Sequence, residues 1–171
     1  MTEELSGGST EPLKARIRAF LAAHNTMTLA TLGLDGAPQA AAVFYAAGND
    51  LCLYFLSSPR SRHSENLLAQ PRVAATVHAD GQAWQVIQGL QIEGRARPVT
   101  GVRETAQAAR VYANRFEFVR GLLDGADGPT TLAGPVATSR FYVLHPRWIR
   151  LIDNALGFGH REELSLENRA P

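Results

Sequence analysis

Residues 26–56, TMTLATLGLDGAPQAAAVFYAAGNDLCLYFL, decide the fold class of this chain. Two turn signals divide the stretch, Asp35-Gly36 and Gly48-Asn49-Asp50. Asp-Gly is a strong signal for a tight β-hairpin, and Gly, Asn and Asp together are typical of turns. The segments between and around these turns are rich in β-branched and apolar residues: 26–32, 38–46 and 51–56. They predict three consecutive antiparallel strands.

The rest of the chain adds three more strands and three helices. Further strand patterns cover residues 72–78, 84–97 and 139–152. The helical spacing of apolar residues predicts helices over residues 12–24, in a short segment before Gln70-Pro71, and over residues 102–123. We expect the apolar stripe of the last helix to consist of Val102, Ala106, Ala109, Ala113, Phe116 and Val119.

Glycine and proline refine the fold class. Gly89 and Gly94 predict bulges or bends in the fifth strand, and Pro146 predicts an edge position or a bulge in the sixth. Hairpin turns at short spacing favour an antiparallel barrel over a parallel doubly wound sheet. No G-x-G-x-x-G sequence follows a strand, so a dinucleotide-binding fold has no support. The sequence therefore predicts a mainly β protein, a six-stranded antiparallel β-barrel with peripheral helices.

Composition limits the classes of partner. The chain has 171 residues, of which 45% are hydrophobic and 19% charged, as is typical of one globular domain. A net charge of +1 gives no overall field for nucleic acid or an acidic membrane, so neither is expected as a partner. Cys52 is the only cysteine, which excludes an intramolecular disulfide and a C-x-x-C pair.

The ends of the chain are polar. The start is unlike a signal peptide, and no apolar run is long enough to span a bilayer, so we expect a cytoplasmic protein. We expect a flexible tail at residues 1–11, one domain at 12–160 and a C-terminal tail at 161–171.

Residues 54–67, YFLSSPRSRHSENL, carry the most informative polar pattern. An apolar strand ends in two serines and a proline, and Arg60, Ser61, Arg62 and His63 follow at the start of a helix. The first N–H groups of a helix favour anions, and arginine adds forked donors, so this pattern suits a terminal phosphate. The pattern is equally typical of a serine-capped helix with solvated arginines, and both interpretations remain open at this point.

The other candidates for chemistry are scattered. Trp148 and Arg150 share one face of the expected sixth strand, which suits a planar ligand with polar edges or a stacked surface pair. The five histidines have no H-x-H or H-x-x-x-H spacing, so no metal site is expected. Cys52 lies in an apolar strand, where a thiol is usually inert. Gly157-Phe158-Gly159 either presents an aromatic residue on a tight turn or belongs to a flexible end.

Three stretches, in this order, resemble the superfamily of FMN-binding split barrels that includes pyridoxamine 5'-phosphate oxidase: TLATLGLDGAPQAAAVFY, LYFLSSPRSRHSENLLAQPRVAATV and IQGLQIEGRARPV. The resemblance covers residues 12–152, and the order and spacing of the stretches are more specific than any one of them. The end, WIRLIDNALGFGHREEL, is similar to a narrower uncharacterised bacterial group, the YhbP-like proteins. The resemblance implies a split β-barrel.

The resemblance also implies a homodimer with FMN in a groove between protomers. The family's Ser-Arg-Lys-like phosphate triplet corresponds to Ser61, Arg62 and His63, and a neutral imidazole is a poorer phosphate partner than lysine. The strand before the triplet would run along the flavin ring, and backbone groups of residues 28–31 would approach from the neighbouring strand. The implied cofactor-binding residues are Thr28, Ala30, Thr31, Tyr54, Phe55, Leu56, Ser57, Ser61, Arg62, His63, Trp148 and Arg150.

The function that follows is an FMN-dependent oxidoreductase or reductase acting on an unknown small molecule, with its catalytic residues unassigned. FMN would carry the electrons, and the protein would bind and orient it. The family oxidase has an arginine–glutamine pattern before its Glu-Gly, which residues 88–94 do not keep, so pyridoxine-phosphate oxidase activity is not expected. Two alternatives stay open: a non-catalytic module that binds or senses flavin, F420 or haem, and a dimeric scaffold without a cofactor.

Overall fold

The computed structural model describes residues 10–117, 119 and 138–166. In chain order, the elements are α1 (Thr10–Ala23), β1 (Thr26–Leu32), β2 (Pro38–Ala47), β3 (Leu53–Ser57), α2 (Arg62–Ala69), β4 (Arg72–His78), the 3-10 helix η1 (Trp84–Val86), β5 (Gln88–Pro98), α3 (Val102–Arg115), β6 (Arg140–Asp153), the 3-10 helix η2 (Asn154–Leu156) and β7 (Arg161–Ser165).

The strands form one antiparallel sheet that closes on itself. Their order is β3-β2-β1-β4-β5-β6-β7, and β3 also pairs with β6. This last pairing closes the first six strands into a barrel, and β7 extends the sheet from β6. The predicted mainly β, six-stranded antiparallel barrel with peripheral helices is therefore confirmed.

Alternation along the strands fills the barrel interior. In β4, for example, Val73, Ala75 and Val77 are buried and the residues between them are exposed. The largest fully buried side chains are those of Tyr45 and Phe55. The Tyr45 hydroxyl donates a hydrogen bond to the Leu21 carbonyl oxygen at 2.9 Å, so the polar end of this core residue is satisfied. The residues that alternate with these buried ones along each strand lie on the outer surface of the sheet.

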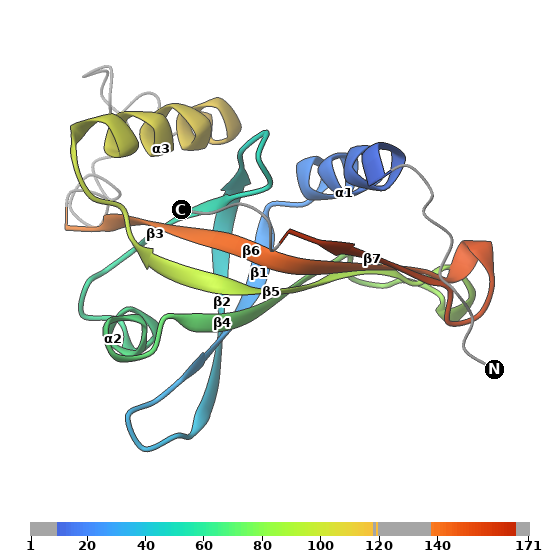
Figure 1. Cartoon of the computed structure of the whole chain (residues 1–171), viewed down its shortest axis with the longest axis horizontal. Helices are drawn as coiled ribbons and strands as arrows, with labels where there is room; N and C mark the ends of the chain where they lie inside the picture. The colour runs from blue at the N-terminus through green and yellow to red at the C-terminus, as the bar shows by residue number, and fades with distance from the viewer. Residues whose placement is uncertain (1–9, 118, 120–137, 167–171) are drawn as a thin grey trace.

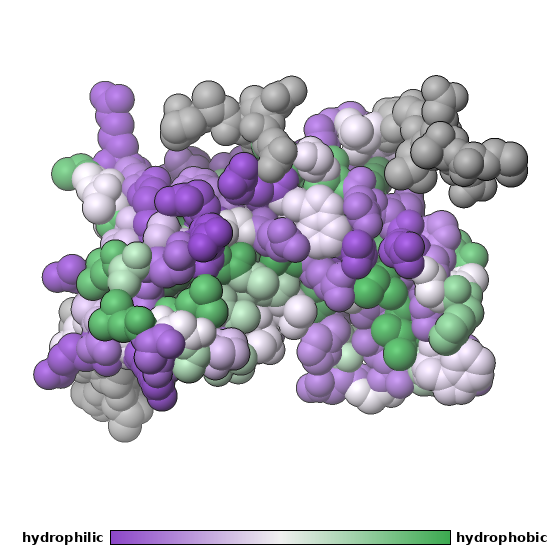
Figure 2. Space-filling view, turned by 60° about the horizontal axis from the view of Figure 1, so that its bottom comes forward, coloured by the Kyte–Doolittle hydropathy of each residue, from purple (hydrophilic) through white to green (hydrophobic). Residues whose placement is uncertain are grey.

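The helices cover different parts of the barrel. In Figure 1, α1 and α3 lie on one side of the sheet, and α2 lies on the other, near the projecting β1–β2 hairpin. Ile17 and Leu21 of α1 and Leu67 of α2 join the main core. None of the helices in the described residues is long and apolar enough to cross a membrane. Figure 2 turns the side with α2 and the hairpin forward, and apolar and polar side chains are intermixed over it.

A bulge shapes the long β5–β6 pair. The register shifts between Glu93 and Gly94, and Arg147 is the extra residue of β6. A Cβ atom on Gly94 would lie 2.3 Å from the His145 carbonyl oxygen, so no larger residue fits without movement of the backbone. The bulges predicted from Gly94 and Pro146 are therefore confirmed, and they coincide.

Two expectations about the strands are wrong. Residues 161–165 were expected in a tail, yet they form β7, because Leu164 joins the barrel core and is only 2% exposed. Residues 84–86 were expected to begin a long strand, yet they form η1. The Asn154 side chain of η2 donates a hydrogen bond to the Trp84 carbonyl oxygen at 2.8 Å, which ties the two short helices together.

The predicted stripe of the last helix is also wrong in part. Ala108 and Tyr112 are the buried residues of α3, whereas Val102 is 87% exposed and Ala106 is exposed. The helix packs on the outer side of β2, β3 and β6, and that contact selects a face that apolar spacing alone did not identify. The helix ends at Arg115, and most of its expected continuation to residue 123 lies outside the described residues, as does most of the expected tail at 1–11.

Candidate functional site

The turn from β3 into α2 gathers hydroxyl groups around one imidazole. We call Ser57, Ser61, His63 and Ser64 the serine–histidine cluster. The Ser57 hydroxyl lies 2.6 Å from His63 Nε2 and 2.9 Å from the Ser61 hydroxyl. The Ser61 hydroxyl is also 3.1 Å from His63 Nε2 and 2.8 Å from the Ser64 hydroxyl. Ser61 is the N-cap of α2, and its Oγ accepts from the Ser64 backbone N–H at 3.4 Å.

The imidazole of this cluster is neutral at pH 7. Burial lowers the pKa of His63 below its ordinary value, because the charged ring loses hydration there. Its Nε2 is shared by the hydroxyls of Ser57 and Ser61. At the position where the resembling family has a lysine, this chain therefore presents a half-buried neutral group. Positive charge for an anion must come from elsewhere.

Arg60 and Arg62 supply that charge. Both are exposed, and neither guanidinium has an ion-pair partner within residues 10–117, 119 and 138–166. The positive end of a helix dipole is an unfavourable place for cations, and Glu65 is the acidic residue of the first turn of α2. Two unneutralised arginines beside the cap at Ser61 therefore make the start of α2 a strong local attractor for anions.

A buried amide joins α2 to the sheet. Asn66 Nδ2 donates to Thr31 Oγ1 at 2.9 Å and to Gln39 Oε1 at 3.0 Å. Asn66 is 5% exposed and Thr31 is 3% exposed, so both hydrogen bonds lie in the interior. Gln39 Nε2 is buried and has no hydrogen-bond partner among the described residues. Because a buried donor without a partner costs about 1–3 kcal/mol, this amide is a candidate contact for a bound ligand.

Sequence reasoning missed Asn66 and Gln39. The signal for Asn66 was available, since it stands beside Leu67 on the side of the short helix that faces the barrel. Gln39 carries no such signal, because its role depends on the pairing of β1 with β2, which places it opposite Thr31.

The expected residues of β3 do not converge on the cluster. Phe55 is in the barrel core, where its ring stacks on Tyr142 with a centroid distance of 5.3 Å. The Tyr54 hydroxyl accepts a hydrogen bond from Gln107 of α3 at 3.2 Å, on the outer side of the barrel. Leu56 packs against the apolar cluster under α3. Of the side chains at positions 54–57, Ser57 is the one that takes part in the serine–histidine cluster.

The strand that contains residues 28–31 is not the neighbour of β3, contrary to the expectation from the sequence. The strand order places β2 between β1 and β3, since consecutive hairpins lay the three strands side by side in chain order. β1 reaches α2 instead, through the hydrogen bond between Asn66 and Thr31.

Thr28 and Ala30 lie on the outer face of the sheet together with Trp148 and Arg150. The register of the strands aligns two outward-facing rows, which together we call the outer face. One row crosses β2, β1, β4, β5 and β6 as Ala40, Ala30, Ala74, Glu93 and Trp148. The next row is Ala42, Thr28, Thr76, Gln91 and Arg150. Small side chains thus form a flat floor on β2, β1 and β4, bordered by polar and aromatic residues on β5 and β6.

Trp148 and Arg150 form a stacked pair. The Arg150 guanidinium lies 4.7 Å from the centre of the Trp148 ring. Both side chains donate to the Glu163 carboxylate, Arg150 Nη2 at 2.8 Å and Trp148 Nε1 at 3.3 Å. The hydrogen bond from Arg150 is the main reason that the pKa of Glu163 is lowered. Glu163 belongs to β7, so the sequence interpretation could not include this partner.

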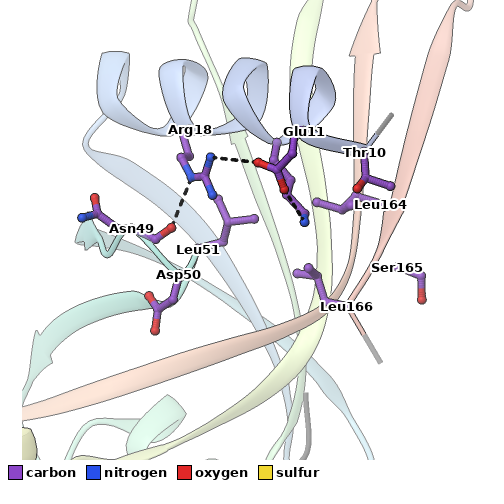
Figure 3. A pocket seen from close by; sticks show the side chains of 10 residues that line it. Thr10, Glu11, Arg18, Asn49, Asp50, Leu51, Leu164, Ser165 and Leu166 are labelled. Atoms are coloured by element: carbon purple, nitrogen blue, oxygen red, sulfur yellow. Dashed lines mark hydrogen bonds and ion pairs between the residues drawn. The ribbon is translucent and has the colours of Figure 1, made fainter. Parts of the chain in front are cut away.

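A cavity of about 260 Å³ lies between α1, the β2–β3 turn and β7 (Figure 3). Its cations already have an ion-pair partner, because Lys14 and Arg18 both face Glu11, at 2.8 Å and 4.0 Å. Arg18 Nε also donates to the Asn49 carbonyl oxygen at 3.2 Å. None of the residues expected from the sequence lines this cavity, and we do not assign it to the site.

Cys52 and His145 form a second polar contact away from the cluster. The Cys52 sulfur lies 3.2 Å from His145 Nδ1, and Arg97 Nη2 lies 3.5 Å from His145 Nε2. A guanidinium can only donate, so His145 Nε2 accepts and Nδ1 carries the hydrogen toward sulfur. Burial, and then Arg97, lower the pKa of His145. Within the described part of the chain, no group of three or more His, Cys, Asp or Glu side chains is placed to hold a metal ion.

Comparison with known proteins decides the family. The family model described as pyridoxamine 5'-phosphate oxidase matches residues 13–151. The chain belongs to this family. The UPF0306 protein of Yersinia pseudotuberculosis is 29% identical over 147 residues, which are 85% of this chain and 88% of that protein. This relative fits the expected YhbP-like group.

Solved structures show the same fold. The haem storage protein HutZ from Vibrio cholerae superposes with a TM-score of 0.63 at 18% identity, over 91% of this chain and 99% of that one. A pyridoxamine 5'-phosphate oxidase homologue from Listeria innocua superposes with a TM-score of 0.60 at 19% identity, over 81% and 97%. At this identity the likeness concerns the fold alone, and the family fold occurs in proteins of different cofactor chemistry.

The residues present fit a phosphorylated cofactor. The start of α2 offers hydroxyls, helix N–H groups and two arginines without ion pairs in the described structure, which is the donor set that a phosphate requires. The oxygen of the Gln39 amide accepts a hydrogen bond from Asn66 of α2, whereas its Nε2 has no partner in the described residues. A second polar part of the same ligand could bind to this Nε2.

Proposed function

We propose that this chain binds FMN at the start of α2 and acts as a flavin-dependent oxidoreductase on a small molecule. The observation that carries the proposal is the pair of exposed arginines, Arg60 and Arg62, on either side of the Ser61 cap, with no ion pair in the described residues. A helix start with this charge is stabilised by a dianionic phosphate. Membership of the pyridoxamine 5'-phosphate oxidase family supports the choice of cofactor.

In this proposal, each group of the chain has a defined part. Arg62 and the Ser61 and Ser57 hydroxyls hold the phosphate, with His63 as a hydrogen-bonding partner that gains a proton more readily once the dianion is bound. Gln39 donates its unpaired N–H to a carbonyl or hydroxyl oxygen of the cofactor. When bound, FMN supplies the redox chemistry, and these residues bind and orient it.

The proposal includes a homodimer with the cofactor at the interface. The flat floor of Ala30, Ala40, Ala42 and Ala74 leaves room for a ring or a partner strand to approach closely. The exposed Phe44, at 54%, adds apolar area on β2. Light scattering should give twice the monomer mass, and Ala30→Arg should lower both that mass and the FMN affinity. A cytoplasmic location stays a prediction of the sequence.

Titration of FMN against the Arg62→Ala variant tests the phosphate assignment. A charge-assisted hydrogen bond contributes about 1.5–3 kcal/mol, so the Kd should rise by roughly 10- to 100-fold. Arg103→Ala, on the exposed surface of α3, is the matched control and should leave the Kd unchanged. Riboflavin, which lacks the phosphate, should bind wild type and Arg62→Ala alike. An Arg62→Ala variant with the Kd of wild type would overturn the assignment.

The visible spectrum separates the proposal from its main alternative. The structural likeness to the haem storage protein HutZ favours haem as the second candidate cofactor. Purified protein that perturbs the FMN absorption bands on mixing supports the flavin assignment. Protein that leaves FMN unperturbed but shifts the haem Soret band would replace FMN by haem. A deazaflavin such as F420 belongs in the same titration series.

Flavin binding alone does not establish turnover. Reduction of bound FMN by a nicotinamide donor, followed by reoxidation with an organic acceptor, supports the oxidoreductase proposal. Tight FMN binding without reaction toward a panel of donors and acceptors would favour a non-catalytic flavin module.

A further inference from the structure

A groove of about 520 Å³ opens where β1, β4, β5 and β6 lie next to one another. Three arginines line it, Arg72 on β4, Arg95 on β5 and Arg147 at the bulge of β6, and Glu93 is its acidic residue. Arg72 and Arg95 alone outnumber Glu93, so this space, the size of a small molecule, carries an excess of positive charge.

The strand register makes this charge cluster costly. Arg72 and Arg95 are direct partners in the β4–β5 pair. Like charges directly opposite each other destabilise a ladder. Arg72 Nε donates to the neutral Gln70 Oε1 at 3.2 Å, and Arg95 has no ion pair in the described part of the chain. Nothing found there neutralises either of these two groups.

Three other arginines of the strands and helices are each matched with an acid. Arg150 pairs with Glu163, and Arg97 pairs with Glu104 at 2.6 Å. Arg16 pairs with Asp153 at 3.2 Å. In the groove, Arg72 and Arg95 face each other instead of an acid, and an anionic ligand would offset the repulsion between them.

The other walls of the groove suit a flat molecule. Trp148 lines one side, and Ala30 and Ala74 form part of the small-residue floor. Alanine side chains leave the surface flat, and an indole offers apolar area against a ring. The lone Glu93 carboxylate can accept a hydrogen bond from a hydroxyl or amino group of the ligand, but it would repel an acid placed beside it.

We propose that this groove binds a small planar acid that carries two or more carboxylate or equivalent anionic groups. Arg72 and Arg95 receive the acidic groups, and the ring lies beside Trp148. The groove shares Ala30, Thr31 and Trp148 with the expected cofactor residues. If the groove is the substrate site of the enzyme, the inference rests on the proposed flavin function. As a binding site, it stands without that function.

Benzene-1,3,5-tricarboxylate is the probe, and its uncharged counterpart benzene-1,3,5-trimethanol is the control ligand. Calorimetric titration should detect the tricarboxylate and not the triol. Because the contacts are ionic, the affinity should fall as salt is raised. In the Arg95→Gln variant the Kd should rise at least tenfold, whereas Arg103→Gln on α3 should match wild type. A tricarboxylate that fails to bind, or binds the two variants equally, would overturn the inference.

Folding and flavin binding provide separate readouts. Since Arg95→Gln removes a like-charge pair, its Tm should equal or exceed that of wild type. Its Kd for FMN should also equal that of wild type, because the phosphate contacts lie at α2. If the protein does not bind FMN but binds the tricarboxylate through Arg95, the proposed function fails and the groove assignment stands. If FMN binds and Arg95 has no effect on the tricarboxylate, the groove assignment fails alone.

Discussion

The serine–histidine cluster and the outer face are built in opposite ways. The cluster comes from one stretch of eight positions, Ser57 to Ser64, where the turn and the helix cap bring side chains together locally. A row of the outer face draws one residue from each of several strands, such as Ala30, Ala74 and Trp148. A site built from neighbouring residues can be recognised in the sequence. A surface that depends on strand register exists only once every strand is paired.

The two regions also differ in how they handle charge. Beside the cluster, Arg60 and Arg62 lie at a helix start without an ion pair in the described residues, and a phosphate is the natural partner there. The groove places Arg72 and Arg95 opposite each other across the β4–β5 ladder, so this pair of charges depends on the register of β4 and β5. Substitutions that disturb the β4–β5 register should therefore affect the groove more than the cluster. Substitutions in the turn from β3 to α2 should affect the cluster more than the groove.

The largest expected effect comes from the bulge that sets the outer face. Gly94→Ala should lower the free energy of unfolding by about 3 kcal/mol, since its Cβ would lie 2.3 Å from the His145 carbonyl oxygen. Gly89→Ala, whose Cβ would lie 3.3 Å from the Val77 carbonyl oxygen, is the matched control and should cost about 1 kcal/mol. Urea unfolding measures both. Equal losses would mean that the bulge is not what fixes this face.

The second effect tests the hydrogen bonds that connect α2 to the sheet. Asn66→Ala should cost about 2 kcal/mol, because Thr31 and Gln39 both lose the buried donor that ties α2 to β1. Leu68→Ala, at an exposed position of the same helix, should stay within about 0.5 kcal/mol of wild type. The measurement is again chemical unfolding, combined with FMN titration. An unchanged stability would show that the cluster and the sheet are independent.

This contrast explains which parts of the fold could be predicted. Strands β1, β2 and β4 carry clear alternation between strong turn signals, and their bounds match the expected segments within one residue. β7 could not be predicted in the same way, because its five residues, REELS, contain one core side chain, Leu164. It is a strand because β6 offers a free edge, and that is a property of the assembled barrel.

The candidate site divides along the same line. Ser57, Ser61 and His63 were expected together from the sequence, and the structure brings them together. Arg72 and Arg95 are 23 positions apart and carry no shared motif, so their cluster appears only through the β4–β5 register. Glu163 was missed because its strand was expected to be a tail.

A smaller effect probes the cap of α2 by itself. Ser61→Ala should lower the free energy of unfolding by about 1 kcal/mol, the typical cost of losing a helix N-cap hydroxyl. Ser58→Ala is the control, since that hydroxyl accepts only a 3.3 Å contact from the Arg60 backbone N–H and caps no helix. Amide hydrogen exchange in α2 should speed up in the first variant alone. Equal exchange in both would show that the cluster does not depend on its cap.

The smallest effect is a pH dependence that distinguishes the cluster from its surroundings. Burial holds the pKa of His63 below its ordinary value of about 6.5, and His145 behaves likewise. Between that value and the lower pKa of the folded state, the unfolded chain binds more protons, so stability falls as the pH falls through this range. His63→Gln should flatten the slope in part, and His63→Gln with His145→Gln should flatten it further.

FMN acts in the other direction on His63, because a bound dianion favours the protonated ring and raises its pKa. Unfolding curves at several pH values, with and without FMN, should therefore show a shallower acid loss in the wild-type complex. A complex whose slope equals that of the free protein would place the phosphate away from His63.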